Sequence, residues 1–248
     1  MDENLEVIAG KNPVLEALRA GRTINKILLA KGNDDKANQE IINLTTAKGI
    51  PIQWVSRQLI EQKAETKAHQ GVLAFVSPIT YVEIEDILSL AQARGQDPFI
   101  LILDHLEDPH NLGAILRTAE AAGVHGVVIP KRRGVSVNTT VSKTSAGAVE
   151  YVPIARVTNL VQTMEKLKQA GCWIVGTDQD AREEYYKADL TGPLAIVVGS
   201  EGKGISRLVK EKCDFTVKIP MAGKINSLNA SVAASIIMFE VYRQRGQA

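Results

Sequence analysis

The chain has 248 residues, of which 45% are hydrophobic and 23% are charged, an ordinary composition for a folded globular protein. This length is enough for one large domain or for two smaller ones, each with its own core. The formal net charge is +1 and is spread evenly along the chain, so a nucleic acid could bind only through a local basic patch. Two cysteines, Cys172 and Cys213, are too few for a disulfide framework or a zinc site, and we expect no metal.

The N-terminal stretch alternates helix and strand signals. Asn12-Pro13 is typical of the start of a helix, because proline is tolerated at the first helical position. The next predicted elements are strands at 26–30, 50–55 and 71–76 and helices at 37–48 and 58–63. We therefore predict a small α/β domain over residues 1–77.

The first ten residues, MDENLEVIAG, are acidic and lack the apolar core of a signal peptide. A run of about 18 apolar residues, which a membrane span requires, is also missing from the sequence. We therefore expect a cytoplasmic protein that has no membrane partner.

Residues 78–96 differ from the segments on either side. The stretch SPITYVEIEDILSLAQARGQDP has a proline near each end, a net negative charge and room for one short helix. Such a composition is typical of a linker between domains.

From Phe99 onward, strand and helix signals alternate on a larger scale, within a predicted domain of residues 97–248. Strands are predicted at 99–106, 126–129, 172–177, 194–199 and 215–219, and helices at 112–122, 158–170, 204–212 and 230–244. This alternation predicts an α/β fold with a parallel sheet covered on both faces. A dinucleotide-binding oxidoreductase is disfavoured, because its glycine-rich turn would follow the first strand, where this chain has DPHN.

The first polar segment is DHLEDPHNLGAILRTAEAAGV, at 104–124. Asn111 stands where a helix cap is expected, and Arg117 follows six residues later. Six helical positions separate two side chains widely around the axis, so they converge only if Asn111 stands off the helix end and Arg117 reaches back. A simple cap and a solvated charge fit the pattern as well.

Two further segments place polar residues after predicted strands. In LAIVVGSEGKGIS, at 194–206, Glu201 lies in a glycine-rich turn at a strand end, where open α/β sheets bind ligands. In IPMAGKINSLNASVAASIIMFEVY, at 219–242, Ser227 and Asn229 would point the same way from an extended backbone. An exposed turn acid and a helix cap are the plain alternatives. Together with the first segment, these junctions indicate one site built from several loops.

The set NLGAILRTAEAAG, IVVGSEGKGIS and IPMAGKINSLNASVAASI resembles, in order and spacing, the three motifs of the SpoU-type RNA ribose 2′-O-methyltransferases of the SPOUT superfamily. The resemblance covers residues 97–246. The N-terminal domain, which ends HQGVLAFV, is similar to the RNA-binding domain of the family's ribosomal RNA members, which has the fold of a small ribosomal protein. LEDPHNLGA, GVHGVVIPK and RVTNL are most similar to the members that methylate a guanosine ribose in 23S ribosomal RNA.

The resemblance implies methyl transfer from S-adenosylmethionine, a C-terminal trefoil knot, and a homodimer with its site near the subunit interface. The catalytic residues that it implies are Asn111, Arg117, Glu201, Ser227 and Asn229. The cofactor-binding residues that it implies are Thr177, Gly199, Glu201, Gly202, Ile219, Met221, Ser227, Leu228 and Asn229. Because a guanidinium stays protonated up to about pH 12, we interpret Arg117 as a fixed cation and not as a base.

Two basic groups are candidates for contact with RNA, although either could be an ordinary solvated surface. They are Lys11, Arg19, Arg22 and Lys26 in the N-terminal domain, and Lys131, Arg132 and Arg133 in the C-terminal domain. A transfer RNA ribose methyltransferase is one alternative, and the extra N-terminal domain argues against it. A non-catalytic RNA-binding ribosome-assembly factor is another, which the intact Asn111, Arg117, Glu201 and Asn229 argue against.

Overall fold

A computed structural model describes residues 5–32, 36–64, 67–224 and 227–246 and divides the chain into two compact units. The first unit comprises Met1–Thr80 and Val137–Tyr151, and the second comprises Tyr81–Ser136 and Val152–Ala248. The segment at 137–151, which we assigned to the C-terminal domain, thus groups with the N-terminal one.

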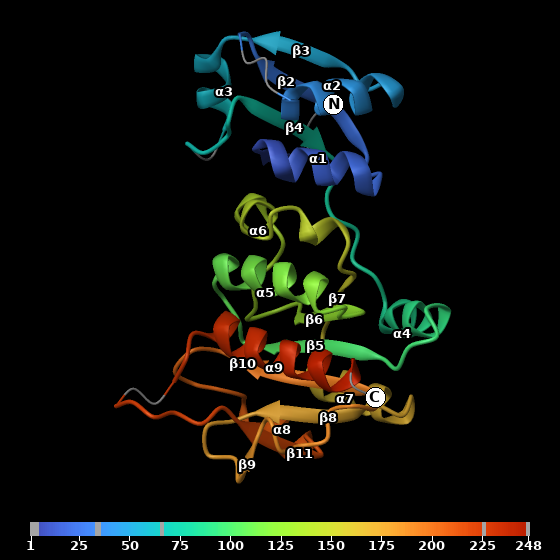
Figure 1. The fold of residues 1–248 in the computed structure, drawn as a ribbon, viewed down its shortest axis with the longest axis vertical. Coiled ribbons are helices and arrows are strands. Elements are labelled where there is room, and N and C mark those ends of the chain that lie inside the picture. The colour runs from blue at the N-terminus through green and yellow to red at the C-terminus, as the bar shows by residue number, and fades with distance from the viewer. Residues whose placement is uncertain (1–4, 33–35, 65–66, 225–226, 247–248) are drawn as a thin grey trace. The chain divides into compact units, whose positions relative to one another are not determined.

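The first unit is a four-stranded sheet with helices on both faces (Figure 1). Its elements are β1 (Glu6–Ala9), α1 (Lys11–Ala20), β2 (Ile24–Ala30), α2 (Lys36–Ala47), β3 (Ile52–Val55), α3 (Arg57–Lys63), β4 (Val72–Val76), α6 (Thr139–Thr144) and the short 3-10 helix η1 (Ala148–Glu150). The strand order is β1-β4-β2-β3, with β2 and β3 parallel and β4 antiparallel to both of its neighbours. Leu18 of α1 and Ile41 of α2 pack on one face, and Ile60 of α3 packs on the other.

The segment at 137–151 is joined to the rest of the first unit by one buried ion pair, between Arg22 and Glu150. The Arg22 guanidinium lies 2.8 Å from the carboxylate of Glu150 and 2.6 Å from that of Glu6. The Tyr151 hydroxyl donates a hydrogen bond to Glu16 at 2.6 Å. Burial raises the pKa of Glu150 despite the neighbouring guanidinium.

The second unit is a seven-stranded sheet in which every pair of neighbours is parallel, so the predicted α/β class is confirmed. Its elements are α4 (Ile84–Ala93), β5 (Phe99–Asp104), α5 (Pro109–Ala121), β6 (Gly126–Pro130), β7 (Ile154–Val157), α7 (Leu160–Gln169), β8 (Trp173–Thr177), β9 (Glu183–Glu184), β10 (Leu194–Gly199), α8 (Arg207–Lys212), β11 (Phe215–Lys218) and α9 (Ala230–Arg245). The strand order is β7-β6-β5-β10-β8-β11-β9.

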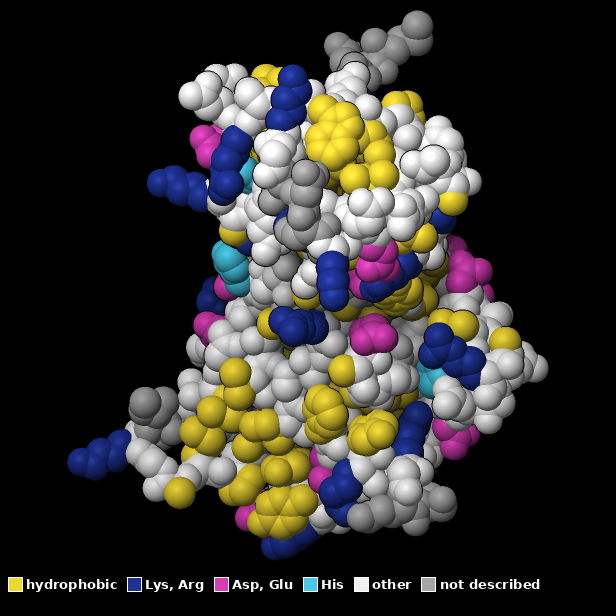
Figure 2. Space-filling view, turned by 45° about the horizontal axis from the view of Figure 1, so that its top comes forward, with side chains coloured by type: hydrophobic (Ala, Val, Ile, Leu, Met, Phe, Trp, Pro, Cys, Tyr) yellow, Lys and Arg dark blue, Asp and Glu magenta, His cyan; other side chains and the backbone are white. Residues whose placement is uncertain are grey.

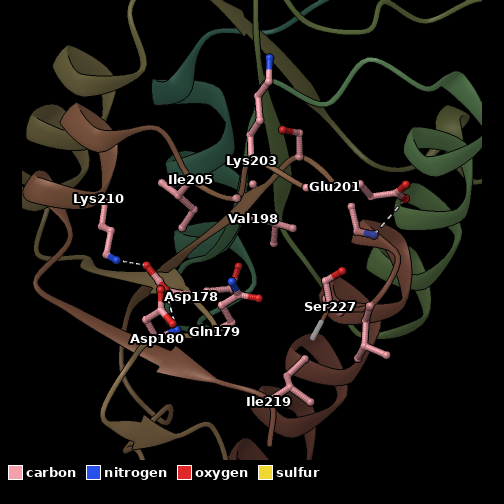
Figure 3. A pocket seen from close by; sticks show the side chains of 18 of the residues that line it. Asp178, Gln179, Asp180, Val198, Glu201, Lys203, Ile205, Lys210, Ile219 and Ser227 are labelled. Atoms are coloured by element: carbon pink, nitrogen blue, oxygen red, sulfur yellow. Dashed lines mark hydrogen bonds and ion pairs between the residues drawn. The ribbon is translucent and has the colours of Figure 1, made fainter. Parts of the chain in front are cut away.

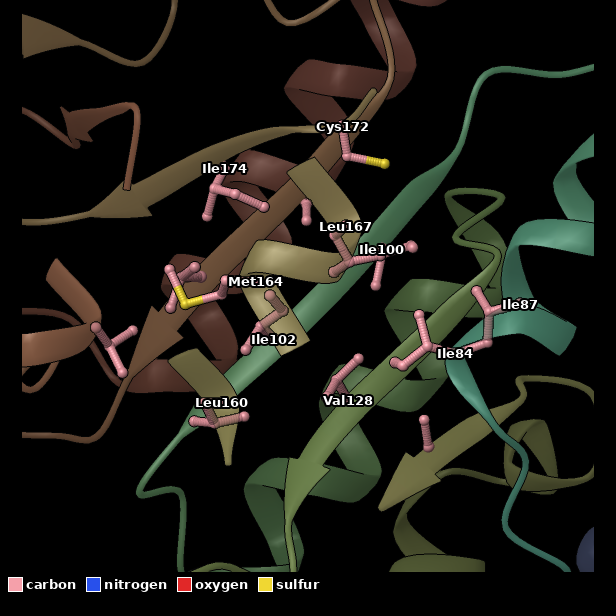
Figure 4. Close-up of a cluster of buried hydrophobic side chains, with 14 of the residues drawn as sticks. Ile84, Ile87, Ile100, Ile102, Val128, Leu160, Met164, Leu167, Cys172 and Ile174 are labelled. Carbon is pink, nitrogen blue, oxygen red and sulfur yellow. The ribbon is translucent and has the colours of Figure 1, made fainter. Parts of the chain in front are cut away.

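The helices cover both faces of this sheet. Met164 of α7 and Val209 of α8 pack on Ile102 and Val197 of the central strands, and Ile87 of α4 joins the same core (Figure 4). On the other face, α5 and α9 lie side by side (Figure 1). The apolar side chains of α4 therefore make part of the predicted linker a structural element of the second unit.

Two local predictions change in the structure. The helix after β5 begins at Pro109 and is capped by Asp108, whose carboxylate accepts the His110 N–H at 2.9 Å. The expectation that Asn111 is the cap is therefore wrong, because the helix starts at Pro109, three residues earlier than predicted, and proline is tolerated at the first helical position. The short strand β7 was not predicted, since four residues carry too little periodicity to detect.

Candidate active site

Three loops of the second unit meet at one edge of its sheet. They follow β5, β10 and β11, and the ends of β5 and β10 are in register, with Asp104 paired to Gly199. Because all strands of the sheet are parallel, their carboxyl ends open toward the same side. This is the edge where the sequence analysis placed the polar residues.

Side chains from the first turn of α5, the loop after β10 and the N-cap of α9 form one hydrogen-bonded network. Asn111 Nδ2 donates to Glu201 Oε1 at 3.0 Å, and Asn229 Nδ2 donates to Asn111 Oδ1 at 2.9 Å and also to Glu201 Oε1. The backbone N–H of Ala230 points to the same carboxylate oxygen at 3.3 Å. Glu201 therefore sits at the N-terminus of α9, where the helix dipole favours an anion.

Asn229 has a second task as the N-cap of α9. Its Oδ1 accepts the backbone N–H groups of Ser231 and Val232, at 2.9 and 3.3 Å. Asn229 thus ties the start of the last helix to Asn111 and Glu201, and its orientation is set by both ends of the amide. The cap, which was the plain alternative for Asn229, is therefore present, and the same side chain also bonds Asn111 and Glu201.

Arg117 stands apart from this network. It lies on the exposed side of α5, and within the described part of the chain its guanidinium forms no hydrogen bond or ion pair. The structure therefore leaves a solvent-facing cation two turns along α5 from Asn111 and does not bring the two side chains together.

A cleft of about 450 Å³ opens beside the network (Figure 3). Of the predicted cofactor-binding residues, those that line it are Thr177, Gly199, Glu201, Gly202, Ile219, Met221, Ser227 and Leu228. Asn229 does not line the cleft but contacts Glu201, which does. Figure 3 shows Ser227 and Ile219 on one side of the cleft and Lys210 on the other.

The glycine-rich loop after β10 is unusually tight. A Cβ at Gly199 would lie 2.1 Å from the carbonyl carbon of Gly204, and the Gly204 N–H donates to Ser200 O at 2.9 Å. Gly202 and Gly204 have φ of +78° and +63°, which glycine adopts without strain. At its glycine positions, the loop therefore presents only backbone to the cleft.

The sequence analysis did not include two acidic residues after β8, Asp178 and Asp180, or the basic residue Lys210. Asp178 forms an ion pair with Lys210 of α8, and both line the cleft together with Asp180. Burial by itself would raise the pKa of Asp178, but hydrogen bonds from Lys210 and from the Asp180 backbone hold it below its usual value. The signal was available, since Asp178 and Asp180 directly follow the strand predicted at 172–177, and strand ends are where such sheets bind ligands.

The basic residues predicted to bind RNA in the first unit do not form an open cluster. The Arg22 side chain is only 6% exposed and is satisfied by Glu6 and Glu150. Its expected place on an RNA-binding surface is therefore wrong, because burying a guanidinium requires paired carboxylates, which occupy its donors.

The remaining residues of that group differ in their surroundings. Arg19 pairs with Glu16 and Glu40 at 2.6 and 2.5 Å, and the Lys26 ammonium lies 4.7 Å from the ring centre of Phe75. The backbone N–H of Lys11 donates to Gln70 at 3.0 Å. In the second unit, the side chains of Lys131, Arg132 and Arg133 are exposed in the loop after β6.

Two other features are absent from the described residues. Groups of three or more His, Cys, Asp or Glu side chains that could hold a metal ion are absent there. In the same part of the chain, helices long and apolar enough to cross a membrane are also absent.

The fold and the cleft define a class of protein: a parallel α/β domain with a cleft at the carboxyl ends of its strands. Residues 98–239 match the model of the SpoU rRNA Methylase family, and residues 7–82 match that of RNA 2′-O ribose methyltransferase substrate binding. The chain therefore belongs to the SpoU rRNA methylase family and is an RNA methyltransferase of the SpoU/TrmH type.

Individual relatives agree with this assignment. A Bacillus subtilis protein with the provisional name TrmH family tRNA/rRNA methyltransferase YacO is 52% identical over 99% of this chain and 98% of its own. The crystal structure of the SpoU methyltransferase AviRb from Streptomyces viridochromogenes, in complex with the cofactor AdoMet, matches with a TM-score of 0.83 and 25% identity, over 99% of this chain and 92% of that one. The A. aeolicus TrmH/SpoU tRNA modifying enzyme matches with a TM-score of 0.56 and 31% identity, over 66% of this chain and 82% of its own.

Proposed function

We propose that this protein transfers a methyl group from S-adenosylmethionine to a ribose 2′-hydroxyl of RNA, with a guanosine of 23S ribosomal RNA as its target. The observation that carries the proposal is the Asn111–Glu201–Asn229 network, which joins three loops beside one cleft. The proposed target follows from the sequence resemblance of LEDPHNLGA and GVHGVVIPK and from the substrate-binding domain at 7–82.

The cleft has features that fit S-adenosylmethionine. The Gly199–Gly204 loop offers backbone groups at close range, and Ile219, Met221 and Leu228 offer apolar contact for a flat base. Carboxylates in the lining are compatible with a cationic ligand. When bound, S-adenosylmethionine would supply a methyl group on a positively charged sulfur atom.

The residues of the network have a positioning task in this proposal. Transfer of a methyl group needs the accepting oxygen in line with the bond that breaks, so holding the ribose in place is most of the work. Glu201 keeps the amides of Asn111 and Asn229 in fixed orientations, because its Oε1 accepts from both. Ser227, which lines the same cleft, adds a hydroxyl that can donate or accept.

Arg117 acts in this proposal as a permanent cation. Its guanidinium is exposed and has no partner among the described residues, so it is available to an RNA phosphate or to an oxygen that acquires negative charge. Lys131, Arg132 and Arg133 are further exposed cations of the same unit. We retain these three as proposed RNA contacts and place the protein in the cytoplasm with that substrate.

We further propose a homodimer that pairs through α9. Val232, Phe239 and Tyr242 are exposed on this helix, and hydrophobic side chains gather in the second unit in the lower half of Figure 2. Exposed aromatic groups of this kind are typical of protein interfaces. The trefoil knot is likewise a proposal, supported by Gln244 near the end of α9, which bonds Ala188 O at 3.1 Å and the Leu190 N–H at 2.8 Å.

One experiment tests the activity and its substrate. Purified protein is incubated with labelled S-adenosylmethionine and separated 23S, 16S and transfer RNAs, and the labelled ribose is then mapped. Label on a 23S guanosine supports the proposal, and label on a transfer RNA supports the alternative substrate instead. Binding of RNA without label on any of them would support a non-catalytic assembly factor. Asn111→Ala serves as the site variant, and label should fall in it.

A further inference from the structure

Asp104, the last residue of β5, is a fully buried carboxylate. Its Oδ2 accepts the backbone N–H of Ser206 at 2.7 Å, and its Oδ1 lies 2.6 Å from Nδ1 of His105. A buried carboxylate needs such donors, because each unpaired oxygen would lose its hydration without compensation. Both oxygens of Asp104 are therefore held in place.

Asp104 connects the two ends of the loop at 200–205. At the start of the loop, Gly199 is paired in register with Asp104 along the sheet. At its end, Ser206 donates to the Asp104 carboxylate. All the residues between these two points line the cleft, whereas Asp104 itself does not.

The same contact sets the start of α8. Ser206 is the N-cap of this helix but makes no side-chain capping bond, so the fixed point at its N-terminus is the bond from the Ser206 N–H to Asp104. One turn further on, Lys210 forms the ion pair with Asp178 across the cleft lining. Asp104 therefore helps to fix two parts of the cleft lining: the loop at 200–205 and, through α8, Lys210.

We propose that Asp104 is a positioning residue for S-adenosylmethionine, which it serves without contact by holding the loop at 200–205 closed against β10. The inference rests on the proposed function for the identity of the ligand. A charge-assisted bond from a buried carboxylate to a backbone N–H is strong enough to fix a loop of this length. Preorganising the loop reduces the ordering that cofactor binding must otherwise supply.

Four variants distinguish loss of the hydrogen bond between Ser206 and Asp104 from other effects of changing either residue. Asp104→Ala removes the acceptor, and Asp104→Asn keeps one carbonyl oxygen for the Ser206 N–H. Ser206→Pro removes the donor without straining the backbone, because the native φ of −62° already suits proline, and its ring carbon also occupies the space between the nitrogen and the Asp104 carboxylate. Ser206→Ala is the matched control, since it keeps the N–H and loses a hydroxyl that makes no capping bond.

The first measurement needs no ligand. Hydrogen exchange of the amides at 200–205 should speed up in Asp104→Ala and in Ser206→Pro, and should stay unchanged in Ser206→Ala. The second measurement is calorimetric binding of S-adenosylmethionine. Its Kd should rise about tenfold or more in Asp104→Ala and in Ser206→Pro, the size expected for loss of a charge-assisted hydrogen bond. Asp104→Asn should recover part of the affinity.

Kinetics distinguish positioning from general damage. The KM for S-adenosylmethionine should rise while kcat at saturating cofactor stays within about threefold of the parent value. A folded Ser206→Pro variant with parental exchange and parental Kd overturns the inference, even if Asp104→Ala fails to fold. Failure of the parent protein to bind S-adenosylmethionine would overturn the proposed function instead, and the exchange measurement would still test the loop anchor.

Discussion

Gly199→Ala is a severe test of the proposed cofactor loop. The added methyl carbon would lie 2.1 Å from Gly204 C, 2.3 Å from Gly204 O and 2.3 Å from the Ile205 nitrogen, all of them backbone atoms. Ordinary contact begins at 3.4 Å, so the loop must move away from β10 by more than 1 Å. Overpacking of this kind costs about 1–3 kcal/mol of unfolding free energy. The displacement should also weaken the hydrogen bond from the Ser206 N–H to Asp104, so the affinity for S-adenosylmethionine should fall as well.

Gly192→Ala is the matched control, because a Cβ there meets nothing within 4 Å. Urea unfolding gives the free energy of each variant, and calorimetry gives its affinity for S-adenosylmethionine. Gly192→Ala should match the parent in both assays. If Gly199→Ala matched it too, the close approach of β10 and the loop would have no bearing on stability or binding, and the reasoning would be refuted.

Three further predictions concern the site and its support. Arg117→Lys keeps the charge but loses the planar fork, so methyl transfer should drop about tenfold or more while calorimetric cofactor affinity stays constant; near-normal turnover would contradict this. Asn229→Ala should lower the free energy of unfolding by about 1 kcal/mol through loss of the α9 cap, and should weaken cofactor binding, whereas unchanged binding would remove Asn229 from the site. Burial, aided by Arg94 and Arg245, lowers the pKa of His125 to about 4 from 6.5. The unfolded chain therefore takes up the proton first, and stability should fall by up to about 3 kcal/mol as pH drops from 6.5 to 4. A His125→Gln variant should show less of this decline in urea titrations, and an equal decline would refute the assignment.

Much of the second unit was predictable from local pattern. Apolar runs such as FILILD and LAIVVG are buried on both faces, and that burial is what a central parallel strand requires. The polar residues that followed these runs were predictable as site candidates, because the carboxyl ends of parallel strands share one edge. Eight of the residues that the family resemblance implies for cofactor binding line one cleft.

Contacts between distant segments were decided by tertiary structure alone. The sequence could not show that Asn229 and Asn111, 118 residues apart, share a hydrogen bond, since the strand order that brings their loops together depends on packing. For the same reason, Arg22 resembled a surface cation until Glu150 was found paired with it from 128 residues away. Periodicity reports which face of an element is buried, but it carries no information about the partner that buries it.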